Sequence, residues 1–117
     1  MANKKKIGIF GGTFDPPHNG HLSLLRHVIK ELSLDKVIVT VANEPWQKTS
    51  SRRITDRDHR FNMTKFLFEE CDDVIVSDIE FRIGGETSTA ETLAELRLEY
   101  PADEFWLIMG LDSAVNF

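Results

Sequence analysis

Cysteine is nearly absent from the sequence: Cys71 stands alone in 117 residues, so no disulfide can form within the chain. Small secreted domains usually depend on disulfides, and we therefore expect a reducing, cytoplasmic setting. The sequence also lacks the run of about eighteen apolar residues that a transmembrane helix requires. The segment between Lys4 and Phe10 is too short for a secretory signal peptide, so we expect a soluble, unprocessed protein.

Positive charge is scarce as well. The chain has 14 lysines and arginines against 19 aspartates and glutamates, which gives a formal net charge of -5. Nonspecific nucleic-acid binding usually needs a basic face, so this balance argues against a nucleic-acid partner. Some of the lysines and arginines cluster in one short stretch, which contains Lys48, Arg52, Arg53, Arg57 and Arg60. Neither a nucleic-acid nor a membrane partner is expected.

Four short apolar runs have the length of strands, and segments with helix caps or helical spacing separate them. Because 41% of the residues are hydrophobic, the chain can bury the core of one domain. The predicted strands are residues 7–10, Val37–Val41, Val74–Val76 with a continuation up to Phe81, and Phe105–Met109.

Capping residues mark the predicted helix starts. Asn19 is predicted to cap a first helix that runs to Leu32. Asp56 is predicted to cap a second helix that ends near Glu70, and Ser88 opens a third with the capping-box pattern. The side chains predicted to face the core are Leu22, Leu25 and Ile29 in the first helix, Met63, Phe66 and Leu67 in the second, and Leu93, Leu96 and Tyr100 in the third.

The alternation of strands and helices predicts an α/β fold with a doubly wound parallel sheet and right-handed crossovers. In such sheets, ligands bind beyond the carboxyl ends of the strands. We therefore expect residues 1–117 to form one domain with its site at that edge. The segments predicted to meet there are residues 11–21, 43–53, 82–89 and Asp112.

A glycine pair and two histidines stand between the first strand and the first helix. Gly11 and Gly12 let the backbone turn and approach a ligand without interference from a Cβ atom. His18 and His21 are three apart, so both can project from one edge of the first helical turn. A helix start favours anions, and imidazoles add directed donors. The pattern predicts a phosphate site, although it is neither a Walker A loop nor the Rossmann G-x-G-x-x-G fingerprint.

With GGTFDPPHNGH between a strand and a helix, the chain resembles the H-x-G-H nucleotidyltransferases, most closely the bacterial nicotinate-nucleotide adenylyltransferases of NAD biosynthesis. The segments EPWQK and DRDHRFNM, and the stretch from Val76 to Asp112, resemble the same family. The resemblance implies a Rossmann-like domain of the nucleotidyltransferase type. It also implies transfer of AMP from ATP to nicotinate mononucleotide, with Mg²⁺ accompanying ATP.

The resemblance also implies a role for each candidate residue. His18 and His21 donate to the α-phosphate and the departing pyrophosphate, and Lys48 adds a positive charge. The long, aperiodic loop around Lys48 separately predicts that Lys48 and the arginines after it form a mobile, electropositive flap over the triphosphate. Thr89 approaches the acceptor, with helix capping as the alternative. Backbone groups of Gly11, Gly12, Thr13 and Phe14 contact the phosphates. Trp46 borders the nucleotide, with ordinary packing as the alternative. Asp112 lies near a ribose or the metal-bound nucleotide, with helix capping as the alternative.

The sequence departs from the family in two places. Ser88 stands where the family usually has an aromatic residue that helps to stack the pyridine ring, so the acceptor is less defined than the adenylyl transfer. The sequence also ends at Phe117, before the family's final strand and its I-S-S-T-x-[IL]-R helix. We therefore expect a fragment of a longer enzyme or a reduced protein, with little activity alone and self-association through uncovered apolar surface.

Three other functions fit parts of the sequence. Another H-x-G-H enzyme, such as a pantetheine-phosphate adenylyltransferase or a cytidylyltransferase, would share the histidine motif. Asp15, His18 and His21, spaced D-x-x-H-x-x-H, could instead bind a transition metal. A noncatalytic nucleotide-binding domain would bind ATP without releasing pyrophosphate.

Overall fold

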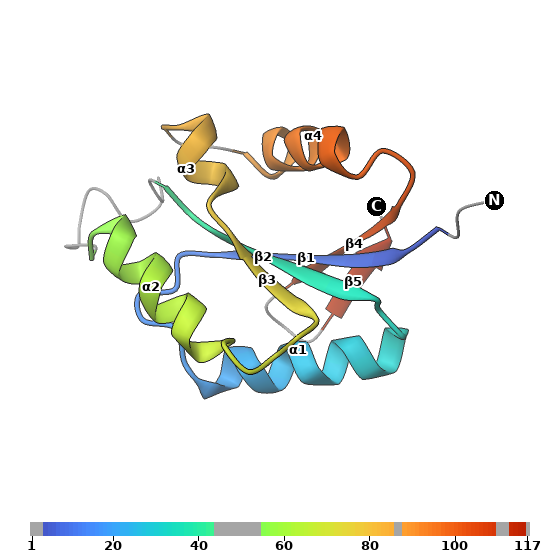
Figure 1. Cartoon of the computed structure of the whole chain (residues 1–117), viewed down its shortest axis with the longest axis horizontal. Helices are drawn as coiled ribbons and strands as arrows, with labels where there is room; N and C mark the ends of the chain where they lie inside the picture. The colour runs from blue at the N-terminus through green and yellow to red at the C-terminus, as the bar shows by residue number, and fades with distance from the viewer. Residues whose placement is uncertain (1–3, 44–54, 86–87, 110–112, 117) are drawn as a thin grey trace.

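A five-stranded sheet with helices on both faces forms the body of the molecule (Figure 1). The structure is a computed structural model and describes residues 4–43, 55–85, 88–109 and 113–116. The elements in chain order are β1 (Lys6–Gly12), α1 (Asn19–Leu32), β2 (Lys36–Val41), α2 (Arg57–Leu67), β3 (Val74–Ser77), α3 (Ile79–Ile83), α4 (Thr89–Glu99), β4 (Glu104–Met109) and β5 (Ser113–Asn116).

The strand order is β3-β2-β1-β4-β5, and the first four of these strands run parallel. Helices α1 and α2 cover one face of the sheet, and α3 and α4 cover the other (Figure 1). This is the predicted Rossmann-like, doubly wound arrangement. The strand β5, which pairs antiparallel with β4, was not predicted as an element from the sequence.

Side chains alternate between the two faces along each central strand, as a pleated strand requires. Ile7 and Ile9 of β1 pack with Leu96 of α4, whereas Phe10 packs with Leu25 of α1. Gly8 lies on the α1 face, where an added Cβ would come within 2.9 Å of a methyl group of Leu34. The absence of a side chain there lets the turn after α1 lie close against the sheet.

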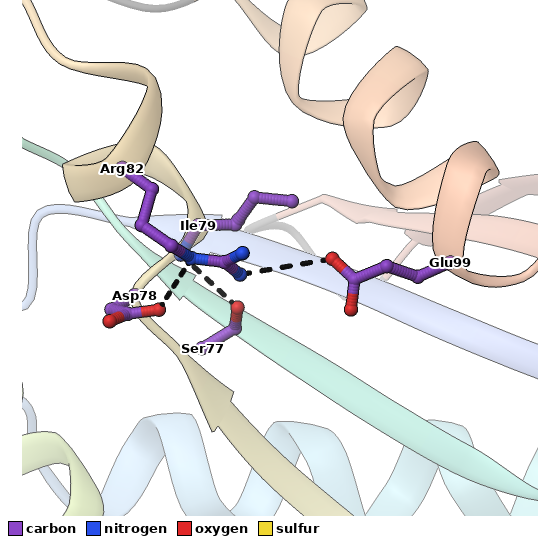
Figure 2. Close-up of polar contacts among 5 residues, drawn as sticks. All are labelled: Ser77, Asp78, Ile79, Arg82 and Glu99. Carbon is purple, nitrogen blue, oxygen red and sulfur yellow. Dashed lines mark hydrogen bonds and ion pairs between the residues drawn. The ribbon is translucent and has the colours of Figure 1, made fainter.

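The predicted continuation of the third strand to Phe81 is wrong. Strand β3 ends at Ser77, whose hydroxyl accepts a hydrogen bond from the backbone N–H of Ile79 at 3.2 Å. The side chain of Arg82 pairs with Asp78 one turn earlier, at 2.9 Å (Figure 2). These local contacts favour the short helix α3, which includes Arg82.

The predicted inner face of α2 is confirmed only at Leu67, which packs against the core, and the helix ends at Leu67 rather than near Glu70. Met63 and Phe66 are 36% and 77% exposed. The fully buried residues are Arg60 and Thr64, with Phe68 just beyond the helix end. The sequence pattern missed this stripe because two of its three members are polar.

Candidate functional site

The segment between β1 and α1 leaves the sheet at the carboxyl end of its central strand. Gly11 and Gly12 belong to β1, where they pair with Thr40 and Val41, so the predicted turn begins after them. A Cβ on Gly12 would lie 3.0 Å from the ring of Phe14. Gly12 therefore makes room for the aromatic ring that folds back over the end of the strand.

Phe14 anchors the turn that follows. Its backbone has a φ of 54°, a left-handed conformation that is uncommon for a bulky residue. Its ring is 4% exposed and makes edge contacts with Phe10, at 5.6 Å between centroids, and His21, at 4.9 Å. Burial of the ring offsets the backbone strain, which is of order 1 to 3 kcal/mol for such positions. The peptide bond between Asp15 and Pro16 is cis.

Two histidines cap the first helix reciprocally. The N-cap is His18 rather than the predicted Asn19, because the imidazole Nδ1 of His18 accepts from the N–H of Gly20 at 3.1 Å. Nδ1 of His21 accepts from the N–H of His18 at 3.0 Å. A Cβ on Gly20 would lie 2.8 Å from the His18 ring, so only glycine leaves room for this cap. The H-x-G-H spacing is therefore a capping motif in its own right.

The reciprocal cap fixes the tautomer of both rings. Because each Nδ1 accepts a backbone N–H, each neutral imidazole carries its proton on Nε2. The rings stack with centroids 3.9 Å apart. Burial, and to a smaller degree the neighbouring His18, lower the pKa of His21 below its ordinary value, which favours the neutral form. The start of α1 thus offers two Nε2 donors beside the positive end of a helix.

A residue that hydropathy did not single out lies behind this turn. Arg60, which the sequence groups with Lys48, Arg52, Arg53 and Arg57, is only 1% exposed. Its guanidinium donates to four carbonyl oxygens from three chain segments, including those of Thr13 and Ala42. Burial lowers its pKa, while Asp15 and Asp56 act in the opposite direction. The available signal was its spacing from Thr64 and Phe68, which lie four and eight residues later and therefore on the same side of a helix.

Contacts between side chains and backbone join the ends of β2 and α3 at the same edge of the sheet. The side-chain amide of Asn43 donates to the carbonyl of Gly85 at 3.2 Å. Arg57 donates to the side-chain oxygen of Asn43 at 2.6 Å and stacks over Phe81. The segments predicted to meet beyond strands one, two and three therefore do so in the residues that the structure describes.

The other candidate residues divide into two groups. Thr89 is the exposed first residue of α4, and Ser88 and Glu91 form the predicted capping box before and after it. Trp46, Lys48 and Asp112 lie outside the described residues, as does most of the predicted flap. The two flap arginines that the structure does describe, Arg57 and Arg60, belong to α2.

The metal hypothesis gains no support. Among the described residues, no three His, Cys, Asp or Glu side chains gather where they could hold a metal ion. Asp15 accepts from the N–H of Thr55 at 3.0 Å, and the Nδ1 atoms of both histidines are occupied by backbone groups.

No helix in the described ranges is long and apolar enough to span a membrane. A groove of about 670 Å³ lies between α1 and residues 70–75, at the amino ends of the strands and away from the histidines.

Comparisons with known proteins show the family to which the chain belongs. The cytidylyltransferase-like family matches residues 9–117. A probable nicotinate-nucleotide adenylyltransferase of Albidiferax ferrireducens is 40% identical over 110 residues, which cover 94% of this chain and 54% of that protein. One from Clostridium tetani is 40% identical over 112 residues, or 96% of this chain and 56% of that protein. The chain thus spans about half the length of these curated relatives.

A solved structure supports the fold independently. Plasmodium falciparum nicotinic acid mononucleotide adenylyltransferase complexed with NaAD aligns with a TM-score of 0.74. The alignment covers 90% of this chain and 51% of that one, at 21% sequence identity. At that identity the likeness concerns the fold alone.

Proposed function

Because the chain belongs to the cytidylyltransferase-like family, we propose that its site transfers the adenylyl group of ATP to nicotinate mononucleotide. The products are nicotinate adenine dinucleotide and pyrophosphate. The observation that carries the proposal is the reciprocal cap of His18 and His21, which leaves two Nε2 donors at the start of α1. The names of the relatives that are 40% identical favour this acceptor over others.

The reaction needs alignment and charge stabilisation more than acid–base chemistry. A phosphate oxygen of the acceptor is already an anion, and it attacks the α-phosphorus of ATP. The bond from that phosphorus to the oxygen bridging to the β-phosphate breaks, and the electron pair leaves with pyrophosphate. The two neutral imidazoles donate to the α-phosphate and to the departing oxygens, where negative charge develops. Neither imidazole has to gain or lose a proton.

Magnesium fits this site as an ion that arrives with the nucleotide. Phosphates and water supply most ligands of Mg²⁺ in nucleotide sites, and the bound ion offsets phosphate charge. Because no described cluster of three acidic or histidine side chains converges on one point, the residues fit that arrangement rather than an all-protein cage. In this proposal Gly11, Gly12, Thr13 and Phe14 line the phosphates through their backbone.

The remaining roles rest on the resemblance to the family. Lys48 adds positive charge near the phosphates, and Trp46 borders the nucleotide. Thr89, exposed at the start of α4, approaches the acceptor. Asp112 lies near a ribose or the metal-bound nucleotide.

The test is product formation from ATP, Mg²⁺ and a series of acceptors by the full-length form, because little activity is expected from the chain alone. We expect nicotinate adenine dinucleotide to form in preference to the products from nicotinamide mononucleotide or phosphopantetheine. His18→Ala and His21→Ala should each lower turnover about 10²- to 10³-fold, the scale for losing one preorganised donor. Preference for phosphopantetheine would assign the chain to another branch of the family. Binding of ATP without pyrophosphate release for any acceptor would indicate a noncatalytic nucleotide-binding domain.

A further inference from the structure

The guanidinium of Arg60 joins three segments that are far apart in the sequence. Nε donates to the carbonyl of Thr55 at 2.7 Å, just before α2. Nη1 donates to the carbonyls of Thr13 at 3.1 Å and Ala42 at 2.6 Å, in the segments that follow β1 and β2. Nη2 donates to the carbonyl of Asn43 at 3.2 Å. All three segments lie at the carboxyl edge of the sheet, where the ligand is proposed to bind.

We propose that Arg60 is a positioning residue, which holds the turn after β1 in its ligand-binding shape and places a buried positive charge behind it. Its effect on phosphate binding rests on the proposed function, whereas its effect on the turn does not. Arg60 itself contacts the protein backbone rather than the ligand.

The peptide between Thr13 and Phe14 shows how the positioning works. In a trans peptide the C=O and N–H groups point in opposite directions. Because Arg60 holds the carbonyl of Thr13 toward the protein interior, the N–H of Phe14 is turned away from the guanidinium. The peptide between Ala42 and Asn43 is oriented in the same way. One side chain therefore sets the direction of backbone donors in two of the segments around the site.

The charge of the guanidinium adds a second effect. The four hydrogen-bond acceptors are neutral carbonyl oxygens, so these contacts solvate the cation without cancelling its charge, which the carboxylates of Asp15 and Asp56 offset only in part. A buried charge is screened less by water and salt than an exposed one. Arg60 therefore contributes a positive potential beneath the turn that the anionic phosphates are proposed to meet.

Lysine cannot replace arginine in this role. Its ammonium group places three donors at one point, whereas the planar guanidinium spreads five donors over a rigid fork. Arg60→Lys keeps the charge but cannot reach three segments at once. Arg60→Met removes the charge and all of the donors while keeping a long, flexible side chain. The two variants separate geometry from charge.

Hydrogen exchange followed by mass spectrometry tests the positioning role on the chain without any ligand. We expect amides in residues 12–15 and 55–57 to exchange at least about tenfold faster in both variants, the size expected from losing one hydrogen bond to a charged group. Amides of β2 report global opening, and exchange there should rise less. Arg97→Met is the matched control, because Arg97 donates to the carbonyls of Tyr100 and Asp103 at the other edge of the sheet. It should affect only residues around 100–104.

The outcomes separate this inference from the proposed function. Unchanged exchange in residues 12–15, or an equal rise everywhere in the chain, would overturn the positioning role. If Arg60→Met does not fold, the same criteria apply to Arg60→Lys. Titration with ATP and Mg²⁺ then tests the effect on the ligand, and we expect about tenfold weaker binding in Arg60→Lys and a larger loss in Arg60→Met. Absence of ATP binding by the unmodified chain would contradict the proposed function and leave the exchange result to decide the role of Arg60.

Discussion

The two helices on one face of the sheet, α1 and α2, bury opposite kinds of side chain. Helix α1 turns Leu25 and Val28 toward the sheet and presents its histidines at its start. Helix α2 buries Arg60 and Thr64 instead, and leaves Phe66 in solvent. Thr64 satisfies its hydroxyl by donating to the carbonyl of Arg60 at 2.7 Å.

This difference separates two ways of supporting a site. An apolar stripe fixes α1 against the sheet, and the start of that helix is then free to carry the ligand donors. A polar stripe fixes α2 through carbonyl groups that belong to the turns around the site. We infer that α1 carries the proposed phosphate donors and that α2 holds the segments around them in place.

Removing one buried side chain from each helix should have the largest effects. Arg60→Met leaves four carbonyls without their charged donor, and Leu25→Ala opens a cavity beneath α1. We expect each to lower the free energy of unfolding by about 3 kcal/mol in urea denaturation. Only Arg60→Met should also loosen the turn at residues 12–15. A loss of unfolding free energy below about 1 kcal/mol in Arg60→Met would show that water replaces the contacts of Arg60. It would contradict the claim that buried polar contacts fix α2 whereas apolar contacts fix α1.

The cap of α1 should be the next most sensitive point. Glycine to alanine inside a helix normally stabilises it by up to about 1 kcal/mol. At Gly20 the new Cβ would meet the His18 ring at 2.8 Å, so we expect the sign to reverse, to a loss of about 1 kcal/mol from the broken cap. Ser23→Ala, at an exposed position one turn later, is the control and should stabilise slightly. Stabilisation by Gly20→Ala would show that the cap contributes little.

Helix α1 could be predicted from the sequence because the features that form it are local. The strand, the glycines and the apolar positions predict where the helix begins and which face is buried, and the structure confirms them to within one residue at the N-cap. The prediction chose Asn19 over His18 because asparagine is the commoner cap. The reciprocal contacts with His21 reverse that preference, and spacing alone does not reveal them.

The buried face of α2 and the end of β3 could not be predicted from the sequence, because the contacts that decide them are long-range or compete with the local pattern. Arg60 is buried only because carbonyls from Thr13 and Ala42 lie within reach, which the order of residues does not show. Hydropathy therefore assigned the core positions to Met63 and Phe66. Strand β3 stops early because Ser77 and Asp78 form contacts that favour a helix over further pairing.

Lowering the pH should weaken the start of α1. The pKa of His21 in the folded chain is below the ordinary value of 6.5, so the unfolded chain binds the proton more readily between the two values. The stability that neutral His21 provides is therefore fully present above pH 6.5 and is lost as the pH falls through the folded-state pKa. Urea denaturation from pH 8 to pH 5 checks this. His21→Ala should show a flatter profile, and identical profiles would contradict the neutral cap.

The smallest effect is expected on the exposed face of α2. Phe66→Ser should change the free energy of unfolding by less than about 0.5 kcal/mol, because the side chain is 77% exposed. Phe68→Ala, two residues later in the buried stripe, is the matched contrast and should cost about 3 kcal/mol or more. Equal losses of unfolding free energy at the two positions would show that Phe66 is buried, as hydropathy predicted. Light scattering of Phe66→Ser also tests the expected self-association through apolar surface.

The most direct test of the site is nitrogen NMR of the chain with ¹⁵N-labelled histidine, at pH 7.5. We predict that His18 and His21 both carry their proton on Nε2, because each Nδ1 accepts a backbone N–H. Addition of ATP and Mg²⁺ should then shift the Nε2 resonances of these two residues more than those of His27 and His59. Protonation on Nδ1 in either residue, or unchanged Nε2 resonances at saturating ATP, would contradict a phosphate site built on the reciprocal cap.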